Sequence, residues 1–262
     1  MNNTTPAKPR SAAVVASVLA MALQSAAASE IVTTTTQAKP MTRTTHESGV
    51  SQTLTARQQA IVPIAAFAAA GDLSKLNDAL NQGLDAGLTV NDNKEILSQL
   101  YAYAGFPRSL NALSELMKVL QARKQRGLTD EVGQEPSQAI PTGKALLEAG
   151  TANQTKLSGA PVKGALFDFA PAVDEYLKTH LFGDIFERDN LDWRDRELAT
   201  VAMLSAMSGV EPQLQAHIRI STNVGLTADQ LQQLVQVLAD RVDAISSQRA
   251  REALKSHLSG RG

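Results

Sequence analysis

The sequence contains no cysteine in its 262 residues. It can therefore form no disulfide bond, and it has no thiolate to act as a nucleophile or as a redox centre. Aromatic residues are also scarce, at 4% of the chain, although 43% of the residues are hydrophobic. Alanine and leucine dominate that hydrophobic fraction, which favours packed helices over sheets of aromatic and β-branched strands. We predict a globular all-α fold.

Strong charge of either sign is missing as well, since the formal net charge is −1. No nucleic-acid partner is therefore indicated. The four histidines show no clustered spacing of the kind that metal ligands adopt, so we predict neither a metal site nor a cofactor.

The N-terminus has the pattern of a signal peptide. Lys8 and Arg10 precede an apolar run, Ser11 to Ala28, that ends in small residues, and we predict cleavage after Ala28. The alternative is a membrane anchor, but the run is rich in alanine, contains Ser17 and Gln24, and is not followed by a basic stop-transfer cluster. We therefore expect a periplasmic or secreted protein of net charge −3 that has no membrane contact after cleavage.

Two segments of the remaining chain, 54–89 and 191–227, resemble each other when one single-residue gap is allowed. The alignment pairs Leu54 with Leu191, Arg57 with Arg194, Gly71 with Gly209, and Gly87 with Gly225. This self-similarity predicts a duplicated helical unit. The predicted organisation is a signal peptide (1–28), a flexible polar linker (29–52), a first repeat (53–127), a connection (128–164) and a second repeat (165–258).

Helix ends are marked in both repeats. Thr55 with Gln58, and Thr227 with Gln230, have capping-box spacing, and Asp192 is an N-cap candidate. Further predictions are a kink at Pro63, two helices within 93–127 that join near Gly105, one short helix around 144–149, and one amphipathic helix through 167–190. Four aromatic side chains of that last segment are expected in the core: Phe167, Phe169, Phe182 and Phe186.

Three phrases carry a resemblance to a known family: "HLFGDIFERDNLDWRDRELATVAML", "LQAHIRISTNVGLT" and "LYAYAGFPRSLNAL". Together they resemble the carboxymuconolactone decarboxylase family, whose members share an all-helical fold with the alkylhydroperoxidases. The resemblance spans roughly residues 54–258. It implies a homo-oligomer, such as a trimer or hexamer, and a small-molecule substrate.

The thiol branch of that family has a Cys-x-x-Cys pair seven and four residues before a motif histidine. Here those positions are Val210 and Gln213, before His217, so peroxidase chemistry is excluded. What the resemblance still implies is an acid/base pair of Glu197 and His217. The first repeat has Ala60 and Ala79 at the aligned positions, so we predict one site per chain.

A composite site is the resulting hypothesis. The Glu/His helices of the second repeat would face a wall of Tyr101, Tyr103 and Phe106 from the first repeat, within one chain or across a subunit boundary. Arginine binds carboxylates in two-point fashion, which makes the nearby arginines candidates to hold a substrate: Arg194, Arg196 and Arg219. The tyrosines are candidates to line the pocket.

Each of these residues also has a structural interpretation. The arginines can be surface charges, Glu197 a favourable first-turn glutamate, His217 a solvated helix residue, and a tyrosine part of the core. The leading function is a cofactor-independent decarboxylase-like enzyme that transfers protons on a small carboxylated or lactone metabolite. The alternative is a non-catalytic oligomeric binding or assembly module of the same fold.

Overall fold

The computed structural model describes residues 53–260, so the predicted signal peptide and the polar linker lie outside the described residues. Helices are the only regular elements in 53–260, as an all-α fold requires. No helix in this range has the length and apolar character needed to cross a membrane.

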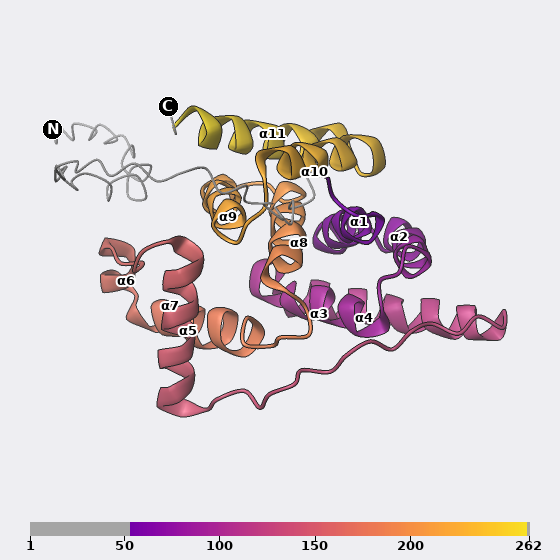
Figure 1. Ribbon diagram of the computed structural model, residues 1–262, viewed down its shortest axis with the longest axis horizontal. Helices are drawn as coiled ribbons and strands as arrows, with labels where there is room; N and C mark the ends of the chain where they lie inside the picture. Colours follow the sequence, from indigo (N-terminus) through magenta and orange to yellow (C-terminus); the bar gives the residue numbers. More distant parts are fainter. Residues whose placement is uncertain (1–52, 261–262) are drawn as a thin grey trace, which may run out of the picture.

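The first repeat supplies four helices in succession, and the second repeat supplies four more in the same order (Figure 1). The first four are α1 (Ala56–Ala70), α2 (Leu73–Asp85), α3 (Val90–Gln99) and α4 (Tyr101–Gln125). The second four are α8 (Trp193–Ser205), α9 (Glu211–Asn223), α10 (Ala228–Arg241) and α11 (Ala244–Ser259).

The predicted helix ends are confirmed where a local signal marks them. Thr55 and Thr227 both form complete capping boxes, and Asp192 accepts a hydrogen bond from the Asp195 amide. Helix α1 runs on through Pro63 without a break. Near the predicted junction, α3 ends at Gln99 and α4 contains one non-helical residue, Gly105, at φ 80° and ψ 161°. Only glycine adopts this backbone conformation readily.

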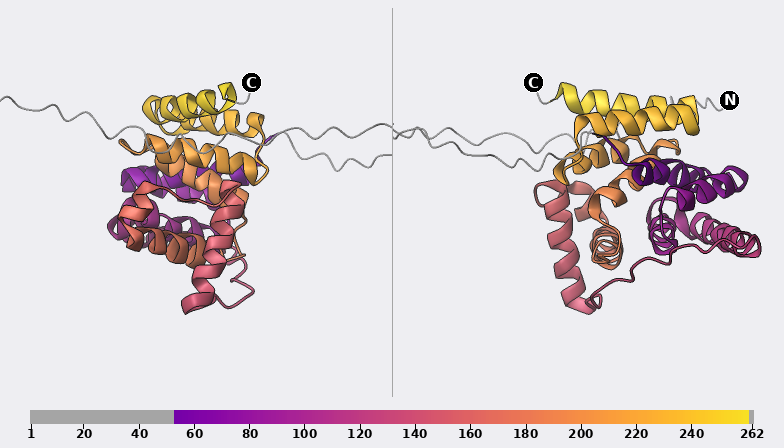
Figure 2. Two further views of the ribbon diagram at one scale, coloured as in Figure 1. Left: turned by 90° about the vertical axis from the view of Figure 1, so that its left-hand side faces the viewer. Right: turned by 45° about the vertical axis from the view of Figure 1, so that its right-hand side comes forward.

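Helices α1 and α8 pack against each other at the centre of the molecule (Figures 1 and 2). Most residues of both helices are buried, so neither helix shows the one-sided apolar pattern of a surface helix. The alanines of α1 and α8 allow the two backbones to approach closely. One apolar core cluster therefore takes side chains from both repeats.

The connection and the lead-in differ from the prediction. The single short helix expected at 144–149 is the longer α5 (Gly143–Ser158). The single helix expected through 167–190 is broken into α6 (Ala165–Phe169), α7 (Pro171–Tyr176) and a π-helix, η1 (Leu177–Ile185). Pro171 lacks an amide hydrogen and begins a new helix instead of continuing the previous one.

This break changes the surroundings of the lead-in aromatics. Phe182 and Phe186 are buried, as predicted, in a second apolar cluster with Leu157. Phe167 is only half-buried, and Phe169 is 88% exposed. The prediction that Phe169 lies in the core is wrong, because the helical periodicity on which it rested does not continue across Ala170 and Pro171.

Candidate functional site

His217 and Glu197 meet inside a single chain. His217 lies on α9 and Glu197 on α8, two helices of the second repeat that pack side by side. The histidine Nδ1 is 2.8 Å from the glutamate Oε2. Glu197 is completely buried and His217 is 7% exposed. The extra residue near Gly209 in the second repeat therefore does not separate the pair.

Tyr103 reaches this pair from the first repeat. Its ring lies edge-on to the imidazole of His217, with 5.5 Å between the ring centroids. Burial and the charge of Glu197 raise the pKa of Tyr103 far above its ordinary value, against a weaker opposite effect of Thr200 and Arg196. The phenol is therefore neutral at physiological pH. Tyr101 has a different role, since its ring stacks on Phe106 at 4.5 Å.

Three buried oxygen atoms near the histidine have no hydrogen-bond partner. They are Glu197 Oε1, the Tyr103 hydroxyl and the Ser221 hydroxyl. Ser221 follows His217 by one helical turn, so both residues lie on the same face of α9. Unsatisfied buried oxygens are uncommon and costly in folded proteins. Sequence analysis missed Ser221, although its spacing of four residues from His217 was a usable signal.

Arg196 does not fit the predicted role in binding substrate. Its side chain is fully buried, and Nη2 lies 3.0 Å from Glu95 Oε2 and 2.9 Å from the Arg188 carbonyl oxygen. Burial lowers the pKa of Arg196, although the nearby Glu95 carboxylate opposes that shift. The guanidinium is therefore engaged inside the protein, where it joins the second repeat to α3 of the first.

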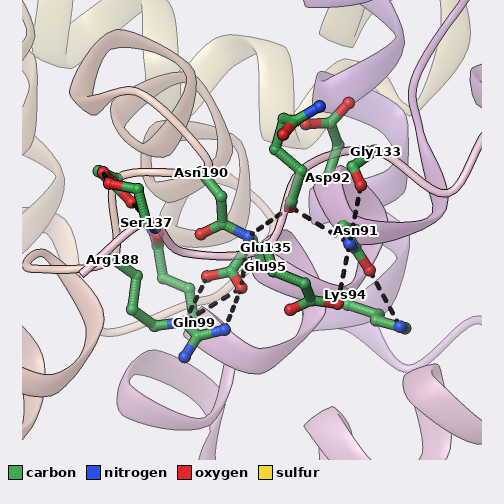
Figure 3. A network of polar contacts seen from close by, with 12 residues as sticks. Asn91, Asp92, Lys94, Glu95, Gln99, Gly133, Glu135, Ser137, Arg188 and Asn190 are labelled. Carbon is green, nitrogen blue, oxygen red and sulfur yellow. Dashed lines mark hydrogen bonds and ion pairs between the residues drawn. The ribbon is translucent and has the colours of Figure 1, made fainter. Parts of the chain in front are cut away.

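Glu95 is the centre of a buried polar network (Figure 3). Its carboxylate accepts hydrogen bonds from Arg188 at 2.7 and 3.0 Å and from Asn190 at 3.1 Å, in addition to the contact with Arg196. Burial by itself would raise the pKa of Glu95, but these hydrogen bonds and the charge of Arg196 outweigh it, and the pKa lies below its ordinary value. Sequence analysis missed this residue, because a glutamate within a helix usually faces solvent.

Gln99 extends the network to the helix that carries Glu197. Its amide nitrogen donates to the Arg196 carbonyl oxygen at 3.1 Å and to the Thr200 hydroxyl at 2.7 Å. All three residues are buried. The part of α8 around Glu197 is thus held against α3 by polar contacts that involve both its backbone and its side chains.

Comparison with known proteins agrees with this arrangement. Residues 171–256, which include the His217–Glu197 pair, match the model of the carboxymuconolactone decarboxylase family. The second half of the chain is therefore similar to that family. It is 33% identical over 70 residues to a protein of Acinetobacter baylyi named 4-carboxymuconolactone decarboxylase. That alignment covers 27% of this chain and 52% of the relative, so the chain spans about half the length of the curated relative it matches.

The two other arginine candidates do not contact the pair. Arg194 is half-buried, and its Nη2 donates to Gln230 Oε1 at 3.1 Å. Arg219 is exposed on α9. It follows His217 by two residues, which places it on a different face of the helix.

Other polar groups offer no competing centre in the described residues. Between residues 53 and 260 there is no group of three or more histidine, aspartate or glutamate side chains that could hold a metal ion. His180 is an exposed residue that pairs with Asp184 at 3.0 Å. The buried His217–Glu197 pair with Tyr103 is therefore the strongest candidate site.

Proposed function

We propose that this protein is a cofactor-independent enzyme that uses His217 and Glu197 to transfer protons on a small carboxylated or lactone substrate. The observation that carries the proposal is the buried contact of 2.8 Å between His217 Nδ1 and Glu197 Oε2. A carboxylate at one ring nitrogen orients the imidazole and leaves the other nitrogen to exchange a proton. The family match of residues 171–256 and the name of the Acinetobacter baylyi relative support a decarboxylase-like reaction.

The proposed reaction needs few groups. When a carboxylated unsaturated lactone loses CO₂, the carbon–carbon bond to the carboxylate breaks and its electron pair moves into the conjugated carbonyl, which becomes an enolate. The second ring nitrogen of His217 then delivers a proton to carbon, and the electron pair returns to form the new carbon–hydrogen bond. The histidine regains its proton from solvent, so no redox partner is required.

The unpartnered hydroxyls fit the charge that develops in this reaction. Tyr103 and Ser221 are buried donors near His217, and an enolate oxygen needs such donors in a site from which water is excluded. The raised pKa of Tyr103 keeps the phenol protonated as a donor. Arg194, three residues before Glu197 on α8, is the remaining arginine candidate for the substrate carboxylate.

A non-catalytic binding or assembly module is the second candidate. Two observations favour it. His217 and Glu197 are almost completely buried, and three pockets of the described surface are lined by other residues, so none of these three gives a substrate access to the pair. A thiol peroxidase is not a candidate, because the chain has no cysteine.

The test is a screen of lactone carboxylic acids with the wild-type protein and three variants. We expect His217→Ala and Glu197→Gln to lower turnover by about 100-fold or more, which is the usual contribution of a general acid or base. His180→Ala is the matched control, because that histidine is exposed, pairs with Asp184 and lies beside the Tyr176 ring, away from the His217–Glu197 pair. Its turnover should equal that of the wild type. Circular dichroism checks that every variant is folded.

The outcomes separate the two candidates. Turnover that survives unchanged in His217→Ala would refute the proposed acid/base role. Absence of turnover in the wild type as well as in all variants would favour the non-catalytic module.

A further inference from the structure

One face of α4 is apolar, and no element within residues 53–260 covers it. Phe106, Leu110 and Met117 are 61%, 58% and 72% exposed, and Leu113 and Leu120 between them are half-buried. The spacings from Phe106 to Leu120 are four, three, four and three residues, the pattern of a helix stripe that packs against a partner. These five residues are called the α4 surface below.

The second repeat shows that the fold does not require this stripe. The aligned positions on α11 are largely polar or charged: Ala244, Gln248, Arg251, Lys255 and Leu258. The two helices occupy equivalent places in the two repeats, yet only α4 carries the apolar stripe. A large exposed apolar patch of this kind marks an interaction site.

The α4 surface borders a groove. A cavity of about 340 Å³ lies between α3 and α4, with an apolar wall that includes Leu113, Met117 and Leu120. Its polar lining carries charges of both signs, Lys94 and Arg188 with Glu95 and Glu135. The groove can therefore receive an apolar side chain.

A second exposed apolar surface lies on α6 and α7. It consists of Leu166, Phe169, Val173 and Tyr176, which are 57%, 88%, 48% and 59% exposed. Phe169 is the most exposed large hydrophobic side chain of the described residues. These four residues are called the α6–α7 surface below.

The two surfaces belong to segments of opposite charge. Helix α4 contains four basic residues and one acidic residue. Arg123 is buried and paired with Asp85 and Asp130, so the other charges of the helix sum to +2. The segment 165–185 contains four acidic residues and one lysine, and its net charge is −3. The charged residues are Arg108, Lys118, Arg123, Lys124 and Glu115 on α4, and Asp168, Asp174, Glu175, Asp184 and Lys178 in 165–185.

We propose that the α4 surface of one copy binds the α6–α7 surface of a second copy of this chain, with Phe169 in the groove beside α4. Within one chain the two surfaces lie on opposite sides of the molecule (Figure 1), so they meet only between copies. The opposite charges favour this pairing, whereas two α4 helices would repel each other. A head-to-tail contact of this kind closes into a ring or continues as a filament.

The experiment measures the mass of the assembly by size-exclusion chromatography with light scattering. The wild-type protein should be larger than a dimer, whereas Phe169→Asp and Met117→Asp should each have the mass of one chain. Ile245→Asp is the matched control: Ile245 is 64% exposed on α11, outside both surfaces, and this variant should assemble like the wild type. Circular dichroism and thermal unfolding check the fold of each variant.

Mixing the two variants gives the sharpest result. Phe169→Asp keeps an intact α4 surface and Met117→Asp keeps an intact α6–α7 surface, so an equal mixture should form a dimer and nothing larger. A monomeric wild type would overturn the proposal. So would a Phe169→Asp variant that still assembles, or a mixture that stays monomeric.

Discussion

Tyr103 comes from the first repeat, yet its ring lies against the histidine of the second. Its hydroxyl is buried without a hydrogen-bond partner, which costs free energy of folding. Proteins tolerate such a destabilising group mainly at functional sites. The Tyr103 hydroxyl is therefore expected to serve function and not stability.

We predict opposite effects of Tyr103→Phe on stability and on turnover. The free energy of unfolding should stay the same or rise by up to about 1 kcal/mol, because an unsatisfied hydroxyl is removed. Turnover should fall by about 100-fold, the usual effect of losing one donor to an oxyanion. Urea denaturation and the lactone-acid assay measure the two quantities.

Tyr101→Phe is the control for that prediction, since Tyr101 stacks on Phe106 and should not affect turnover. A large loss of stability in Tyr103→Phe would show that the hydroxyl is structural. Unchanged turnover in an otherwise active protein would exclude it as a donor to the substrate.

Helices and their ends show how far local sequence signals extend. The caps at Thr55, Asp192 and Thr227 depend on side chains within three residues of the backbone they bind, so they could be predicted. The break between α6 and α7 and the length of α5 could not, because packing between elements decides them. Gly150 of α5 illustrates this: a Cβ atom there would lie 1.7 Å from the Lys178 carbonyl oxygen of η1.

Gly150→Ala should therefore destabilise the protein, although alanine is the better helix former. We expect a loss of about 1–3 kcal/mol in the free energy of unfolding, because α5 and η1 must move apart to admit the methyl group. Urea denaturation measures the change, and Thr151→Ala, at the next and exposed position of α5, should be close to neutral. A stabilised Gly150→Ala variant would show that the two elements do not pack this closely.

At the scale of the whole molecule, the two repeats form one folding unit. Helices α1 and α8 share one core cluster, and Glu95 of the first repeat is bound to Arg188 and Arg196 of the second. Removing one partner of a buried ion pair leaves the other charge uncompensated. The ion pair of Glu95 and Arg196 links the two repeats, and protonation of the Glu95 carboxylate at low pH should weaken it.

Glu95→Gln should lower the free energy of unfolding at pH 7 by about 3 kcal/mol. Folding lowers the pKa of Glu95 below its ordinary value of 4.5. Its contribution to stability is therefore complete above pH 4.5 and is lost as the pH falls through the lower value of the folded state. The difference between wild type and variant should narrow accordingly in urea denaturation below pH 4.5.

Glu148→Gln is the matched control, since Glu148 is an exposed residue paired with Lys144 on α5. Exposed pairs contribute little, so this variant should behave like the wild type at every pH. A difference between wild type and Glu95→Gln that is constant with pH would contradict the proposed ionised state of Glu95.

Features that depend on composition and on neighbouring residues could be predicted from the amino-acid sequence. These are the all-helical fold, the capped helix starts, and the absence of thiol chemistry that follows from a cysteine count of zero. Its resemblance to a family also singled out Glu197 and His217. Each of these inferences rests on residue types or on spacings within a short segment.

Which side chains are buried, and which of them meet, depends on the packing of the helices in three dimensions. This packing placed Arg196 inside the protein on Glu95, brought Tyr103 and Ser221 near His217, and left Phe169 at the surface. Contacts between residues about a hundred positions apart, such as Glu95 with Arg196, depend on how the helices cross. Periodicity along the chain fixes the face of a helix, but not the neighbour against which that face packs.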